Sequence, residues 1–266
     1  MKIKIIEDES GVSEAIGFIL VFTIVILGIS IVTLYGYPAL ADARISSDEK
    51  IMEQNMIVLQ NDIKILTRSN VPYRDTTIGV SGGSIFVTNS SQANAEGGEH
   101  FNITYYVDDT FTNITTYYPG SMEFVSDEGT AVISVANGAV VKRQQDLGGS
   151  VMVSDPRWFY DETEGTLVIF MTSLNSTQPM ALGGIGTIQM AMLTPPVIHD
   201  YSYSIQRPVI IEYFPDPDDD YSRAWETYFT GPYIVASGFT PVPPNAYRLD
   251  VDRLVIKEYT VDILGI

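Results

Sequence analysis

Cysteine is absent from the 266 residues, and histidine occurs only at His100 and His199. Without cysteine the chain cannot form a disulfide framework, a cysteine nucleophile, a zinc ribbon or an iron–sulfur cluster. Two isolated histidines give little basis for a metal centre or a Ser-His-Asp triad, and no G-x-S-x-G motif is present. We therefore expect a protein that is not an enzyme, and we expect no cofactor apart from the calcium considered below.

Positive charge is also scarce. The chain has 15 Lys and Arg against 33 Asp and Glu, for a formal net charge of −18. Phosphate binding needs a basic face, and the cations form no cluster along the sequence. We expect no nucleic-acid partner, whereas a self-repelling acidic outer surface suits this balance.

Charge is missing altogether between Ala15 and Ala41. A membrane-spanning helix needs about 20 mostly apolar residues to cross about 30 Å of hydrocarbon, and Ile16–Tyr37 meets this requirement. The sequence therefore predicts one spanning helix, with membrane lipid as its partner. Lys2 and Lys4 favour an inside N-terminus, which places the C-terminal domain outside. Pro38 is expected to bend or locally break the helix.

A cleaved secretory signal is the alternative interpretation of this segment. The apolar block is longer than the core of such a signal, and no A-x-A site follows it, although Ala39, Ala41 and Ala43 offer small residues.

The residues Gly11–Leu20, GVSEAIGFIL, resemble the class III signal region of archaeal type IV pilins and pilin-like proteins. In that family a prepilin peptidase-type enzyme removes a short polar leader, and the apolar helix enters a filament core or stays in the membrane. The resemblance implies a leader over residues 1–11, cleavage between Gly11 and Val12, and a pilin-like helix over 12–41. Glu9 and Ser10 stand where the family usually has basic residues. The close match covers about 30 residues, and a broader similarity extends to about Gly83.

The same resemblance implies an assembly helix that includes Glu14, Gly17, Phe18 and Pro38. Glu14 is a lone carboxylate beside the apolar block, where charge is costly unless it is paired. It would either pair with the mature N-terminal amine of a neighbouring subunit or lie at the level of the lipid headgroups. The implied partners are other copies of the chain or other pilin-like subunits.

An amphipathic helix is predicted over residues 42–70, because apolar residues recur at helical spacing. The stripe consists of Ile45, Met52, Met56, Leu59, Ile63 and Leu66. Such a helical stalk packs either on its own globular domain or on neighbouring subunits, and three heptads also allow a coiled coil.

Residues 71–266 have the texture of an antiparallel β-sandwich, with short β-branched or aromatic runs separated by turn residues. Gly82-Gly83 and Asn137-Gly138 each predict a hairpin, and Ser222–Phe229 predicts a short helix. The expected strands are Thr77–Val80, Ser84–Thr88, Phe101–Tyr106, Met122–Val125, Ala131–Val135, Ala139–Val141, Leu167–Thr172, Gly186–Leu193, Val197–Ser204, Pro208–Phe214, Arg248–Ile256 and Glu258–Ile263. The fold class is therefore α+β, with a long N-terminal helix ahead of an outward-facing β head.

Four N-x-S/T sequons are glycosylation candidates, as expected of loops in an exported glycoprotein. They begin at Asn89, Asn102, Asn113 and Asn175.

Asp216, Asp218 and Asp220 alternate as oxygen ligands do in the first half of a calcium loop. The full helix–loop–helix pattern fails, because Tyr221 and Thr227 stand where glycine and glutamate are required. A solvated acidic turn is the alternative. A second segment, Asp155–Glu162, places aromatic residues among charges, which indicates either a buried corner or a contact surface.

Together these features favour a membrane-anchored archaeal pilin-like surface protein that is a subunit of a type IV pilus-like filament. The alternative is a non-assembling single-pass surface protein whose β-domain binds a ligand, a glycan or an envelope layer.

Overall fold

The computed structural model describes residues 9–69, 71–144, 148–231 and 239–266. The chain divides into two units, residues 1–47 and 48–266. Its helical start consists of α1 (Glu9–Ile31), a π-helical turn η1 (Val32–Gly36) and α2 (Tyr37–Arg68). Of the predicted leader, residues 1–8 lie outside the described residues.

The helix α1 is apolar on every side. Large apolar side chains from Ile16 to Leu34 are each at least 48% exposed. The hydroxyls of Thr23, Ser30 and Thr33 donate to carbonyls four residues earlier, at 2.7–2.9 Å, so these polar groups have partners within the helix. A helix that is apolar all round suits a membrane. This one is long and apolar enough to span it.

Pro38 perturbs the helix without breaking it. A proline ring clashes with the carbonyl four residues earlier, which here belongs to Leu34. The chain widens into η1, where the Tyr37 N–H donates to the Val32 carbonyl five residues back, and then continues as α2. The predicted disturbance is therefore present, but it lies in the turn before the proline.

The second half of α2 is a core element of the β-domain. Met52, Met56, Leu59, Ile63 and Leu66 are all at most 2% exposed. They pack against apolar residues of the sheet in one continuous cluster. Of the two interpretations of the amphipathic stripe, packing on its own domain is the one observed. The second compact unit begins at Asp48, within the predicted helical segment 42–70.

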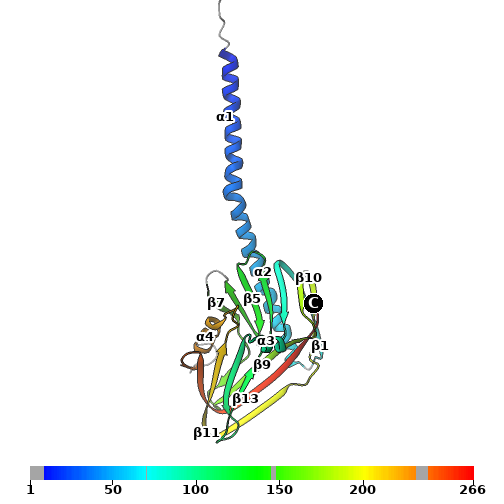
Figure 1. Cartoon of the computed structure of the whole chain (residues 1–266), viewed down its shortest axis with the longest axis vertical. Helices are drawn as coiled ribbons and strands as arrows, with labels where there is room; N and C mark the ends of the chain where they lie inside the picture. The colour runs from blue at the N-terminus through cyan, green and yellow to red at the C-terminus, as the bar shows by residue number, and fades with distance from the viewer. Residues whose placement is uncertain (1–8, 70, 145–147, 232–238) are drawn as a thin grey trace, which may run out of the picture. The chain divides into compact units, whose positions relative to one another are not determined.

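Thirteen strands and two further helices follow in the described part of the chain. The strands are β1 (Tyr73–Thr88), β2 (His100–Tyr106), β3 (Thr112–Tyr117), β4 (Ser121–Ser126), β5 (Ala131–Ala136), β6 (Ala139–Gln144), β7 (Ser150–Ser154), β8 (Phe159–Asp161), β9 (Thr166–Ser176), β10 (Met180–Ala191), β11 (Val197–Phe214), β12 (Thr240–Val242) and β13 (Ala246–Gly265). The helices are α3 (Ser90–Glu96) and α4 (Ser222–Thr230), and α4 lies against β7 (Figure 1). The predicted α+β class, a long helix followed by an antiparallel β-domain, is confirmed.

All thirteen strands belong to one hydrogen-bonded sheet. Its main path is β3-β2-β11-β13-β10-β1-β4-β5-β6-β7, with β8, β9 and β12 attached beside it. The long strand β13 connects the β3-β2-β11 part of the sheet to the part that begins at β10, because it pairs with both β11 and β10. The strand β9 runs parallel to β13. Residues of β13, which are far from α2 in the sequence, are thereby brought into the same core as α2.

The hairpin predicted at Gly82-Gly83 is wrong, whereas the one at Asn137-Gly138 is confirmed. β1 continues through Gly82, which has a positive φ of 69°, and its register with β10 shifts between Val80 and Ile85. A Cβ on Gly83 would lie 2.3 Å from the Val125 carbonyl oxygen, so the glycine serves close strand packing. Asn137 and Gly138 have φ of 47° and 70° and connect β5 to β6.

The sheet lines two separate cores. The first surrounds α2 and is aliphatic and methionine-rich. The second is aromatic and holds both tryptophans, Trp158 and Trp225, whose rings lie 6.1 Å apart. Within the Asp155–Glu162 segment, Trp158 is 5% exposed and lies in a buried corner, whereas Phe159 is 45% exposed and remains on the surface.

Leu59→Ala is expected to lower the free energy of unfolding of the β-domain by about 2–5 kcal/mol, because it leaves a cavity beside the sheet. Val58→Ala is the matched control, since Val58 is 51% exposed on the same helix. Denaturant unfolding of the full chain in detergent, followed by tryptophan fluorescence, measures both. Equal midpoints for the two variants would contradict the placement of α2 in the core.

Candidate functional site

The predicted assembly residues Glu14, Gly17, Phe18 and Pro38 are exposed to solvent or lipid as far as the described residues are concerned. Glu14 is exposed, and no described atom comes within 4 Å of a Cβ built on Gly17. Phe18 is 71% exposed and its ring stacks on Phe22 with centroids 6.1 Å apart. Gly11 and Val12 lie in the first turn of α1, and their side chains are outside the described residues. This surface is free to contact lipid or another helix.

The four sequons occupy different settings. Asn89 caps α3, and its side-chain amide donates to the Ser176 carbonyl at 3.1 Å. The amides of Asn113 and Asn175 donate to Tyr105 and Asp262, at 3.0 and 2.9 Å. Asn102 lies in β2, where its side-chain oxygen accepts a hydrogen bond from the Thr116 hydroxyl. Asn113 is the exposed member of the four, so it offers the most accessible amide.

The acidic run before α4 does not converge on a point. Asp216 and Asp220 each accept a backbone N–H bond, from Asp218 and Ser222 at 2.9 and 2.7 Å. Within the described ranges no group of three or more His, Asp or Glu side chains is placed to hold a metal ion. Calcium binding at Asp216, Asp218 and Asp220 therefore stays a prediction.

A buried acidic centre lies beside the aromatic core. Glu99 is buried and accepts a hydrogen bond from the Trp225 indole N–H at 3.2 Å. Burial raises the pKa of Glu99 to about 8, and nearby Glu123 adds to the rise. Burial likewise raises the pKa of Glu123 to about 7, with Asp219 contributing. Near neutral pH these carboxyl groups retain protons, which lets them remain inside without full charge.

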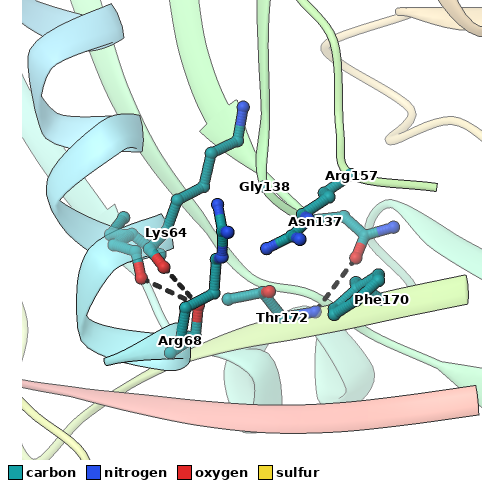
Figure 2. A pocket seen from close by; sticks show the side chains of 9 residues that line it. Lys64, Arg68, Asn137, Gly138, Arg157, Phe170 and Thr172 are labelled. Carbon is teal, nitrogen blue, oxygen red and sulfur yellow. Dashed lines mark hydrogen bonds between the residues drawn. The ribbon is translucent and has the colours of Figure 1, made fainter. Parts of the chain in front are cut away.

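A small cavity, here called the basic pocket, lies where the end of α2 meets the β5–β6 turn and β9. It has a volume of about 20 Å³, and three of its lining residues are cationic: Lys64, Arg68 and Arg157. Figure 2 shows Lys64 and Arg68 entering from the helix and Arg157 from the other side. Phe170 and Thr172 form the wall on β9, with Asn137 beside them.

Sequence reasoning missed the basic pocket. Its cations come from positions about 90 residues apart, and only the sheet brings them together. The available signal is weak: Lys64 and Arg68 are four residues apart and therefore share a helix face. His100 and His199 are in structural settings, stacked on Phe214 and Tyr201 respectively.

Fold and surface together define a class of protein: an α+β chain with one helix apolar enough to cross a membrane and a large antiparallel β-domain. The chain belongs to a family of unknown function, DUF7289, whose model matches residues 11–262 and so covers helix and β-domain together. No curated protein and no solved structure matches the chain.

Glu99→Gln is expected to stabilise the domain at pH 7 by about 3 kcal/mol and to reduce its pH dependence. In the parent, the unfolded state loses the Glu99 proton near pH 4.5, whereas the folded state keeps it up to about pH 8. The folded state thus binds more protons in this window, and the free energy of unfolding falls as pH rises. A neutral glutamine removes this slope while keeping an oxygen for Trp225.

Urea unfolding at pH 5, 6, 7 and 8 measures the effect, with Glu162→Gln as the exposed control. Parallel stability curves for Glu99→Gln and the parent would refute the assignment of a retained proton to Glu99.

Proposed function

We propose that the chain is a membrane-anchored, pilin-like surface protein whose N-terminal helix both spans the membrane and assembles with other subunits. The observation that carries the proposal is helical continuity. One helical course joins the uncharged segment Ile16–Tyr37 to the half of α2 that is buried in the β-domain.

This helical continuity matters because no loop lies between the apolar segment and the half of α2 that is buried in the β-domain. The buried half is fixed by apolar packing and by polar bonds on its flanks. Gln60 donates to the Gly138 carbonyl at 2.7 Å, Asp62 pairs with Arg74 at 2.5 Å, and Lys142 bridges Glu49 and Glu53 at 2.9 and 2.7 Å. These contacts fix the second half of α2 to the sheet of the β-domain.

The resemblance of Gly11–Leu20 to class III signal regions supports processing and assembly. After removal of the leader, Val12 would carry a free amine, and Glu14 would lie two residues away at the edge of the apolar block. An amine on a neighbouring subunit would neutralise this carboxylate, which lowers the cost of placing it in an apolar filament core.

The processing part predicts an intact mass for the membrane-extracted protein that corresponds to residues 12–266. Mass spectrometry of protein from its native host measures this directly. Retention of Met1 would contradict processing at Gly11-Val12 and would remove the main support for assembly.

The assembly part predicts that Glu14→Gln abolishes incorporation into surface filaments while the protein still reaches the membrane, because the subunit-to-subunit charge pair is lost. Electron microscopy of cells and membrane fractionation give the two readouts. Asp42→Asn is the matched control, because it removes an exposed carboxylate outside the apolar block. Filaments of normal abundance with Glu14→Gln would contradict the role of Glu14.

The second candidate is a single-pass surface protein that does not assemble and whose β-domain binds a ligand. The basic pocket favours it, because converging cations are a binding feature with no part in helix assembly. Cells that carry the membrane-inserted protein without filaments would decide for this candidate.

A further inference from the structure

Within the described residues, the cations of the basic pocket differ from most others in forming no close ion pair with a carboxylate, although Asp155 lies near enough to Lys64 to interact with its charge. In the described ranges, ion pairs with Asp or Glu are formed by Arg74, Lys142, Arg143, Arg207, Arg223, Arg248 and Arg253. None of Lys64, Arg68 and Arg157 takes part in such a pair. The chain carries 33 acidic residues, so a shortage of carboxylates does not explain this.

Arg157 lies close enough to both Lys64 and Arg68 for the like charges to repel. Burial lowers the pKa of Arg157, and neighbouring Arg68 lowers it further. Burial also lowers the pKa of Lys64, with Asp155 opposing the shift and Arg157 adding to it. Like charges that converge in a partly buried site cost free energy unless an anion joins them.

The sheet holds these cations in place. The Arg157 guanidinium lies 5.0 Å from the centroid of the Phe170 ring, and the Lys257 amine lies 5.3 Å from the same ring. Lys64 donates to the backbone carbonyl of Asp155 at 3.0 Å. Helix-end stabilisation accounts for Arg68 in the last turn of α2. It does not account for the approach of Arg157 from the loop between β7 and β8.

We propose that the basic pocket is a binding site for a single oxyanion group, a phosphate, sulfate or carboxylate, held by Lys64, Arg68 and Arg157. Guanidinium groups match the geometry of such oxygens and bind them in pairs. The volume of about 20 Å³ is close to that of one or two water-sized probes, so the pocket takes in one or two oxygens of an anionic group and leaves the rest of the ligand outside. The rest of the ligand would lie outside, beside the exposed Arg68.

Inorganic phosphate and sulfate are the probes, titrated into the full chain in detergent at constant ionic strength with chloride as reference. Both are expected to bind by calorimetry and to raise the melting temperature, since an anion that binds the folded state stabilises it. Arg157→Gln is expected to weaken phosphate binding at least tenfold, whereas Arg157→Lys, which keeps the charge, loses less. Arg223→Gln is the control, because this exposed arginine pairs with Glu226 away from the pocket.

Arg68→Gln provides a second test at an exposed position where misfolding is not expected, and it should weaken binding by a similar factor. Far-ultraviolet circular dichroism without added anion should be unchanged in both glutamine variants, which shows that the loss of binding is not a loss of folding. A soluble short-chain phosphatidylglycerol distinguishes a lipid headgroup from a soluble anion as the ligand. If it binds more tightly than phosphate and Arg157→Gln abolishes this binding, the ligand is a lipid headgroup. If it binds equally or more weakly, the ligand is a soluble anion. Phosphate that acts no better than chloride, or an equal loss with Arg223→Gln, would overturn the proposal. None of these outcomes depends on filament assembly.

Discussion

The burial of one apolar stripe of α2 is the interaction on which the rest of the structure depends. One face of α2 packs into the first core, and strands from β1 to β13 supply the other side. The buried residues of this face are Met52, Met56, Leu59, Ile63 and Leu66. Without this helix the sheet would expose a continuous apolar surface to water. The sheet therefore needs α2, and α2 is chemically continuous with the apolar helix that precedes it.

The sequence was informative wherever one local pattern decided the structure. The uncharged run from Ala15 to Ala41, the heptad-like stripe of α2 and the Asn137-Gly138 turn each require only short-range physics, and each appears as predicted. Gly82-Gly83 was misassigned, because a glycine pair that permits close strand packing looks the same in sequence as a glycine pair in a turn. Likewise, the sequence predicts two strands in place of β11 and two in place of β13, because a polar residue within a long strand looks the same in sequence as a residue in a turn.

The candidate site was beyond reach for a different reason. The basic pocket depends on where β9 and the loop before β8 meet α2, and strand order follows from long-range pairing that single residues do not encode. The sequence has no cluster of Lys and Arg, yet the fold creates one from Lys64, Arg68 and Arg157. The buried acidic centre of Glu99 and Glu123 arises in the same way. In a chain with net charge −18, strand pairing thus brings Glu99 and Glu123 together and leaves the three cations of the basic pocket facing its cavity.

Membrane residence of Ile16–Tyr37 underlies both candidate functions, and the absence of cysteine from the chain allows it to be measured directly. Val25→Cys and Glu164→Cys each introduce a unique thiol, the first in the apolar segment and the second in the exposed turn before β9. Val25 is 51% exposed within the chain itself, so its protection would have to come from surrounding lipid or neighbouring helices. In reconstituted vesicles, a polar maleimide is expected to label Glu164→Cys rapidly and to leave Val25→Cys unlabelled. Labelling of both thiols at the same rate would contradict a membrane-spanning helix.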